Sequence, residues 1–139
     1  MKKNTGELME DLMEAGSFDL YLKQNRAQMI SSSVGMQLKK LCRRRRISKA
    51  LAARRSGLSE VYLHQVLAGR RSPSRNKVLC LCIGLSATME ETQDLLRQAG
   101  YAGLDPRKMR DAVILYGISR GQSLEQIKSA LLERGEQAL

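Results

Sequence analysis

The sequence predicts an all-α fold. Apolar residues recur at helical spacing along most of the 139-residue chain, and short polar residues of the helix-capping type stand in front of several of these stretches. No run of alternating β-branched residues, the pattern of a half-buried strand, is present. Because 42% of the residues are hydrophobic, the chain has enough apolar side chains for the helical core of about one to one and a half domains.

Residues 4–29 predict two short amphipathic helices. Apolar side chains fall at helical spacing on both sides of Gly16-Ser17, and acidic residues are prominent in the first stretch. The apolar positions are Leu8, Leu12, Met13, Phe18, Tyr21 and Leu22. We place these helices in an N-terminal segment, residues 1–32, with its boundary at the serines of residues 31–33.

The positive charge of the chain is concentrated in one segment. Thirteen of the 24 Lys and Arg residues lie between Lys39 and Lys77, where Glu60 is the only acid. This segment carries a net charge of about +12, against about −2 for the remainder. Such a segment indicates a face that binds a polyanion, although a basic run alone is equally compatible with a solvated surface.

Within the basic segment, residues 48–67 predict two short helices around a tight turn. Ser48 has the side chain to cap the first helix, and the small Ala53 allows the second helix to cross closely over it. Gly57 supplies the left-handed backbone that such a turn requires, and Ser59 caps the second helix. The residues expected to face the core are Leu58, Leu63 and Val66.

The loop after these helices carries the most specific signal. It reads Ala68-Gly69-Arg70-Arg71-Ser72-Pro73-Ser74, so it ends a helix at a glycine, turns at a proline and restarts at a capping serine. Together with Ala53, Gly57 and Leu63, this loop resembles the Cro/repressor-type (XRE-like) helix-turn-helix family, in which a Gly-basic-basic-x-Pro-Ser loop follows the recognition helix. The resemblance covers roughly residues 34–85. It implies a five-helix DNA-binding domain, which we place at residues 33–99.

The resemblance also implies where the helices of this domain lie. The first four are expected at residues 33–45, 48–55, 59–67 and 74–84. The fifth begins at Thr88, which has capping-box spacing to Glu91. One departure from the family pattern is that Ala52-Ala53 stands in place of the usual Leu-Ala pair, with Leu51 one position early. This departure predicts a shifted packing of the second helix.

In this family the outward face of the third helix lies in the major groove of DNA. The residues on or beside that face, and hence the candidates for base contacts, are Ser59, Glu60, Val61, His64 and Gln65. A Val side chain can pack on a thymine methyl group and a Gln can pair bidentately with adenine. Glu60 is unusual there, because phosphate repels an acid unless that acid accepts a hydrogen bond from cytosine. His64 fits a DNA donor and a solvated residue equally well.

Basic residues on both sides of this helix are candidates for phosphate contacts, which supply register and most of the affinity. They are Arg43, Arg44, Arg45, Arg46, Lys49, Arg70, Arg71, Arg75 and Lys77. The expected partner is therefore double-stranded DNA. Because one such domain buries too little surface to be selective in a genome, we expect a homodimer on a palindromic site with half-sites roughly 34 Å apart.

Residues 100–139 predict a C-terminal helical extension. Asp105-Pro106 has the cap and first-turn proline that begin a helix, and Gly117 or Gly121 ends it. A second capping box at Ser123 opens a last helix. An apolar stripe packed on its own domain and an exposed one look alike in sequence, so the extension fits intramolecular packing, a protein partner or a small ligand.

Several other classes of protein are not expected. The sulfurs of Cys80 and Cys82 point about 200° apart on a helix and the single His64 lies on another helix, so we expect no metal. Because His64 has no nucleophilic partner and no phosphate-binding glycine loop is present, neither catalysis nor a cofactor is expected. No stretch of about 18 apolar residues and no signal core occurs, which predicts a cytoplasmic protein without a membrane segment.

We favour a sequence-specific transcriptional regulator that acts as a repressor. The alternative is a protein-interaction adaptor or antitoxin-like partner in which DNA binding is secondary, as the structured N-terminal and C-terminal segments suggest. RNA binding through the basic segment is the third hypothesis. It is less favoured because RNA readers usually expose aromatic residues for stacking, and the only aromatic residue in this segment is Tyr62.

Overall fold

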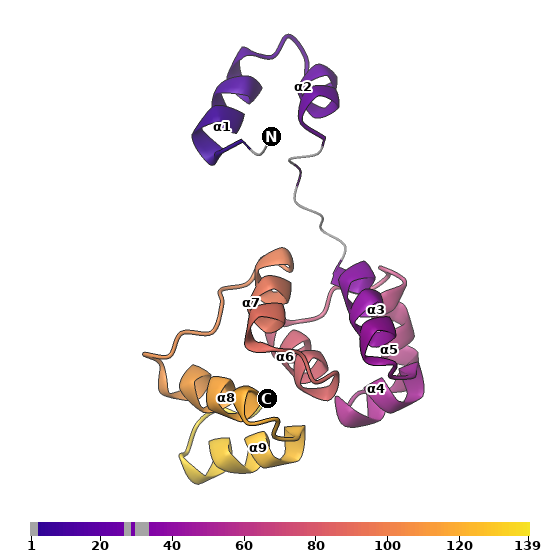
Figure 1. Cartoon of the computed structure of the whole chain (residues 1–139), viewed down its shortest axis with the longest axis vertical. Helices are drawn as coiled ribbons and strands as arrows, with labels where there is room; N and C mark the ends of the chain where they lie inside the picture. The colour runs from indigo at the N-terminus through magenta and orange to yellow at the C-terminus, as the bar shows by residue number, and fades with distance from the viewer. Residues whose placement is uncertain (1–2, 27–28, 30–33) are drawn as a thin grey trace. The chain divides into compact units, whose positions relative to one another are not determined.

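The structure, a computed structural model, describes residues 3–26, 29 and 34–139. Over these residues the chain folds into nine α-helices and has no strand (Figure 1), so the all-α class is confirmed. The chain divides into two compact units, residues 1–31 and 32–139, each defined by contacts among its own residues.

The first unit is a helical hairpin. Helix α1 spans Thr5–Glu14 and α2 spans Phe18–Asn25, which confirms the two predicted N-terminal helices. Each helix has a local cap, since Asn4 accepts a hydrogen bond from the Glu7 amide and Ser17 accepts one from the Leu20 amide. The predicted boundary at residues 31–33 lies outside the described residues.

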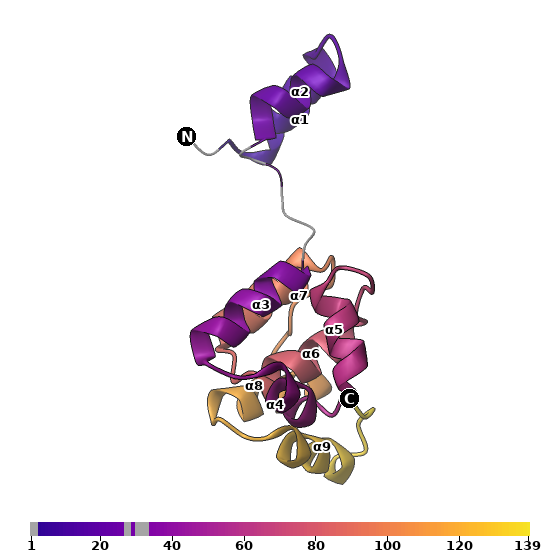
Figure 2. The ribbon, with the colours of Figure 1, turned by 90° about the vertical axis from the view of Figure 1, so that its right-hand side faces the viewer.

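The second unit holds the remaining seven helices of the described chain (Figure 2). They are α3 (Val34–Arg45), α4 (Lys49–Arg55), α5 (Glu60–Leu67), α6 (Arg75–Gly84), α7 (Met89–Gln98), α8 (Met109–Ser119) and α9 (Leu124–Glu133). The predicted five-helix count is not matched exactly, because α8 and α9 join α3–α7 in the same compact unit. The predicted division of that unit at residue 99 stays a prediction.

Helix α6 lies at the centre of the second unit. All its residues from Val78 to Gly84 are buried, so the helix is covered on every side. It packs against α4, α7 and α9. Gly84 allows the closest of these approaches, because a side chain there would collide with Ser56 at the end of α4. The helix-turn-helix is therefore held on a buried helix that α9 also covers.

The helix that follows the 101–108 loop begins later than predicted. The expected start at Asp105-Pro106 is wrong, since α8 begins at Met109. The Asp105 carboxylate does not cap a helix; it accepts hydrogen bonds from the amide and the guanidinium of Arg107. Of the two glycines expected to end α8, Gly121 follows its last turn with φ +66°, whereas Gly117 is buried within the helix.

The capping boxes predicted at two later helix starts are both present. Thr88 and Glu91 exchange hydrogen bonds at the start of α7, and Ser123 and Gln126 do so at the start of α9. Gly117 of α8 faces Ile127 of α9, and its missing side chain lets the two helices approach closely. Helices α8 and α9 thus form a second hairpin that packs on the rest of the unit through α6 and α7.

Candidate DNA-binding surface

Helices α4 and α5 and the turn between them form the centre of the candidate site. Ser48 caps α4 by accepting a hydrogen bond of 3.1 Å from the Leu51 amide, and Ser59 caps α5 by accepting one of 3.1 Å from the Tyr62 amide. Between the helices, Gly57 has φ +65°, the left-handed conformation that the turn requires. The local predictions for this segment are therefore confirmed.

The inward faces of these helices are closely packed. Leu63 and Val66 of α5 are almost fully buried, as predicted, and Leu58 is half-buried against the same core. Ala52 and Ala53 fill the buried positions of α4, while Leu51 is half-buried. The short alanine pair brings α4 close to α5 and α6, which fixes the direction of α5.

The five candidates for base contacts lie on the outer side of α5 or beside it. Val61 is 69% exposed. The Glu60 and His64 side chains are both more than half exposed, and 4.0 Å separates Glu60 Oε1 from His64 Nε2. Ser59 is exposed and Gln65 is half-buried. The structure brings the five residues together on one helix, and their contact with bases stays a prediction.

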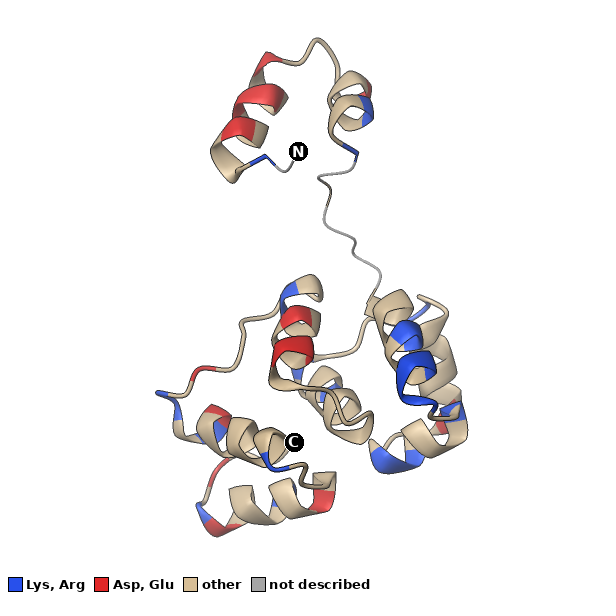
Figure 3. Cartoon of the chain, viewed as in Figure 1, with Lys and Arg blue, Asp and Glu red and all other residues tan. Residues whose placement is uncertain are grey.

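Six of the nine candidates for phosphate contacts are exposed, and one of the six, Arg44, pairs with Glu91. None of the other five has an acidic partner within the part of the chain that the structure describes. They are Arg43, Arg46, Lys49, Arg70 and Arg71. Figure 3 shows basic segments along α3 and at α4, whereas acidic segments are prominent on α1 and α7.

The loop that carries Arg70 and Arg71 is fixed to the end of α5. The amides of both residues donate to the Gln65 carbonyl, at 2.9 and 3.3 Å. The Tyr101 hydroxyl donates to the Pro73 carbonyl at 2.7 Å, which anchors the other end of the loop. The backbone of the two arginines is thus held at a defined position at the end of α5.

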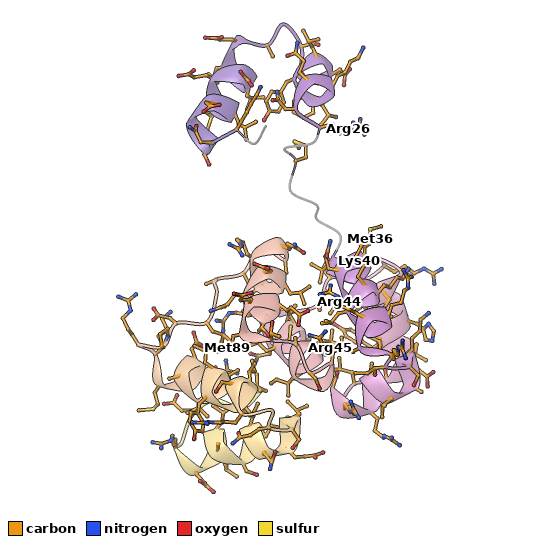
Figure 4. The ribbon with its side chains drawn as sticks, viewed as in Figure 1. Arg26, Met36, Lys40, Arg44, Arg45 and Met89 are labelled. Atoms are coloured by element: carbon orange, nitrogen blue, oxygen red, sulfur yellow. The ribbon has the colours of Figure 1, made fainter. Side chains whose placement is uncertain are left out.

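The other four candidates have partners within the protein. Arg44 Nη1 lies 2.8 Å from Glu91 Oε2, and Arg45 also pairs with Glu91, so that both side chains extend from α3 toward α7 (Figure 4). Arg75 pairs with Asp111 at 3.3 Å, and Lys77 Nζ lies 4.5 Å from the centre of the Tyr62 ring. These contacts connect helices of the fold. A phosphate contact by these four residues stays a prediction.

Three basic residues absent from the predicted set line hollows next to α4. Lys39 lines a hollow of about 450 Å³ together with Arg43 and Lys49. The sequence could have indicated Lys39, because Lys39 and Arg43 are four residues apart and therefore share one side of a helix. Arg54 and Arg55 line a groove of about 560 Å³ between the end of α4 and the start of α9. Only the packing of α9, which sequence patterns do not reveal, brings the two walls of that groove together.

Burial makes the cysteines and Tyr62 poor titrating groups. Desolvation raises the pKa of the Cys82 thiol to about 12, and it also raises the pKa of the Cys42 and Cys80 thiols and of the Tyr62 hydroxyl. All three cysteines are buried and unpaired. Among the described residues, no group of three or more His, Cys, Asp and Glu side chains is arranged to hold a metal ion.

No helix in the described part of the chain is long and apolar enough to cross a membrane. Residues 33–95 match the family model of a helix-turn-helix domain. The chain therefore contains a helix-turn-helix domain in this segment, consistent with the resemblance to XRE-like proteins, and the match ends inside α7. No curated protein and no solved structure matches the chain. A domain of this class indicates a DNA-binding regulator.

Proposed function

We propose that this protein is a sequence-specific transcriptional repressor that binds a palindromic operator in double-stranded DNA as a homodimer. The observation that carries the proposal is the outward face of α5, which exposes Val61, Glu60 and His64 and is followed by a loop whose Arg70 and Arg71 amides bind the Gln65 carbonyl. A helix with polar and apolar groups at its surface and cations next to it suits insertion into the major groove.

Exposed Lys and Arg side chains bind the phosphate backbone of the DNA. Lys39, Arg43 and Lys49 approach one hollow at the start of α4, and Arg70 and Arg71 lie at the end of α5. Each phosphate contact releases a counterion, so the logarithm of the binding constant falls by about 0.9 per contact for each tenfold rise in salt. Five such contacts give strong binding at low salt with no sequence preference.

Sequence preference comes from the side chains of α5. Val61 offers a methyl surface for a thymine methyl group, and Gln65 offers the donor and acceptor pair that matches adenine. Ser59 caps α5 through its oxygen, which leaves its hydroxyl proton available for a base acceptor. Glu60 lies beside His64, and the pair presents an acceptor to a cytosine amino group.

The small number of base pairs that one recognition helix contacts is the reason to propose a homodimer and a repressor. One recognition helix reads only a few base pairs, each worth about 1–3 kcal/mol, and a two-fold dimer doubles that number on an inverted repeat. Repression requires nothing further, because a dimer that covers an operator excludes other proteins from it. An activator would in addition need a specific contact with the transcription machinery.

The experiment is selection from a pool of random DNA duplexes at two salt concentrations, with single-stranded RNA of the same length as a parallel arm. Enrichment of an inverted repeat whose half-sites lie about one helical turn apart supports the proposal. The matched variants are Arg70→Ala, which should weaken binding to every duplex, and Val61→Ala, which should change the enriched sequence. Binding without any preference, or tighter binding to the RNA, would overturn the proposal.

A further inference from the structure

The α1–α2 hairpin has no apolar core of its own. Across the described residues of the first unit, no hydrophobic side chain is buried, and Asn25 is the only buried residue. Six of the twelve large hydrophobic side chains exposed in the described chain belong to this unit. They are Met9, Leu12, Met13, Phe18, Leu20 and Met29. The 31-residue unit is thus far richer in exposed apolar surface than the rest of the chain.

A unit of this size and composition needs a partner. Domains below about 40 residues rarely fold on one hydrophobic core, and those without disulfides or metals usually associate. Inside the hairpin, Lys3 binds Asp11 at 2.5 Å and Asn25 at 2.9 Å. Phe18 and Tyr21 make a ring contact at 6.1 Å, yet Phe18 stays 62% exposed.

The apolar and acidic residues of α1 occupy opposite sides of the helix. At 100° per residue, Leu8, Met9, Leu12 and Met13 fall within an arc of about 140°, and three of the four remain exposed beside α2. The four acidic residues fall on the opposite side. They are Glu7, Glu10, Asp11 and Glu14. A partner that binds the apolar side therefore leaves Glu7, Glu10 and Glu14 in solvent, and leaves Asp11 paired with Lys3.

We infer that the exposed apolar side of the hairpin, centred on Met9, Met13 and Phe18, binds the same surface of a second copy of the chain and forms the dimer interface. The inference deepens the proposed function, on whose dimer it rests. It assigns that dimer to the α1–α2 hairpin, so that two hairpins form a four-helix bundle.

The distribution of charge favours a second copy at this position. Residues 1–31 hold four basic and five acidic side chains, so two hairpins meet with little repulsion. Residues 32–139 hold twenty basic and nine acidic side chains, so two copies of that unit repel each other strongly. Two chains are therefore expected to meet at their nearly neutral hairpins.

Two other partners for the exposed apolar side of the hairpin are less compatible with the structure. Attraction to the basic unit of the same chain would engage the acidic side of α1 and leave Met9 and Met13 uncovered. A different protein would have to be present whenever the chain is made, whereas a second copy always is. Methionine also suits a self-complementary surface, because its flexible side chain adapts to irregular contacts.

Sedimentation equilibrium of the full chain without DNA tests the inference. We expect a dimer, and Met13→Glu and Phe18→Glu should each raise the dimer dissociation constant by roughly 10- to 100-fold. The matched control is Leu132→Glu, which places the same charge on the most exposed apolar residue, 80% accessible, of the second unit. The control should leave the dissociation constant unchanged.

A spin-label measurement tests the same interface without a glutamate substitution, which could itself unfold the hairpin. Met13→Cys adds an exposed thiol, while the native Cys42, Cys80 and Cys82 are at most 8% exposed. A nitroxide at residue 13 should report a defined distance between two chains that disappears on dilution with unlabelled protein. A monomer at every concentration, or a dimer insensitive to both glutamate variants, would overturn the inference.

Binding to a single half-site separates this inference from the proposed function. The glutamate variants should bind one half-site as the native chain does, and should lose only the cooperative gain on the full inverted repeat. Absence of half-site binding by the native chain would contradict the proposed function and leave the hairpin interface standing. Normal half-site binding by a chain that never dimerises would contradict the interface alone.

Discussion

Arg75 of α6 and Asp111 of α8 form an ion pair that joins the helix-turn-helix segment to the C-terminal hairpin. The closest atoms, Nη2 and Oδ2, are 3.3 Å apart, and the Asp111 side chain is only 6% exposed. Arg75 also donates to the carbonyls of Ala102 and Gly103, and Asp111 accepts from the Asp105 amide. The pair thus fixes the loop before α8 against the first residue of α6.

Arg75→Ala should therefore lower stability. Removing the guanidinium leaves the Asp111 carboxylate buried with one amide donor. We expect a loss of roughly 3 kcal/mol in the free energy of unfolding, the low end for a broken buried pair, since Arg75 is itself 26% exposed. Urea titration measures the loss. The matched control is Arg70→Ala, an exposed substitution expected to change stability by no more than about 0.5 kcal/mol.

Salt dependence of DNA binding distinguishes a structural Arg75 from a phosphate contact. Arg70→Ala should reduce the slope of log binding constant against log salt by about 0.9, whereas Arg75→Ala should leave that slope unchanged. The opposite pattern, with a reduced slope and native stability in Arg75→Ala, would show that its side chain leaves Asp111 to bind DNA.

Glu91→Gln should release Arg44 and Arg45 without removing the cap of α7. The glutamine retains the oxygen that accepts from the Thr88 amide at 2.9 Å, but loses the charge that pairs with both arginines. We expect a stability loss of about 1 kcal/mol that shrinks as salt screens the pair. Asp94→Asn removes the same charge from an exposed pair on the same helix and should cost less. Equal losses would contradict the inter-helix role of Glu91.

Gly35→Ala should destabilise the contact between α3 and α5. A Cβ atom at this position would lie 2.5 Å from the Val66 carbonyl oxygen and 2.9 Å from that of Leu67. Because both obstacles are backbone, the helices must separate, and overpacking of this kind costs about 1–3 kcal/mol. In an unobstructed helix the same substitution stabilises by roughly 0.5–1 kcal/mol. Thermal unfolding shows whether Gly35→Ala lowers or raises stability, and Lys40→Ala on the exposed side of α3 is the control.

Helix starts were predictable because caps are local. Ser48, Ser59, Ser74, Thr88 and Ser123 each cap the helix expected from their position, since the capping oxygen reaches an amide only two or three residues ahead. The helix-turn-helix was predictable for the same reason. Its turn glycine, its caps and its buried alanines all lie within twenty residues.

The predicted helix start at Asp105-Pro106 is wrong because other contacts compete with the local signal. Asp105-Pro106 has the local signature of a helix start, but Asp105 binds Arg107 and its amide binds Asp111, so the chain turns there first. Contacts between distant residues could not be predicted either, as the pairing of Arg44 and Arg45 with Glu91 shows. Glu91 lies 46 residues from Arg45, and no local pattern reveals that separation as a contact.

The five-helix count is not matched exactly, because α8 and α9 belong to the same compact unit as α3–α7. Residues 78–84 of α6 are buried all round, and α9 provides part of that cover. The helix that begins after Ser123 was predicted from its capping box, but its packing on α6 was not. An apolar stripe on a C-terminal helix looks the same whether it packs on its own domain or on a partner.

Gln65→Ala should relax sequence preference without weakening non-specific binding. The Gln65 carbonyl, which accepts the Arg70 and Arg71 amides, is backbone and survives the substitution. The phosphate contacts of that loop should therefore persist. The lost amide removes about 1–3 kcal/mol of discrimination at one or two base pairs of each half-site. Selection from random duplexes, compared with binding to a duplex that lacks the enriched site, measures both effects. Arg71→Ala is the contrasting variant, expected to weaken binding to every duplex alike. If Gln65→Ala weakens all duplexes equally, the side chain supports the loop and does not read a base.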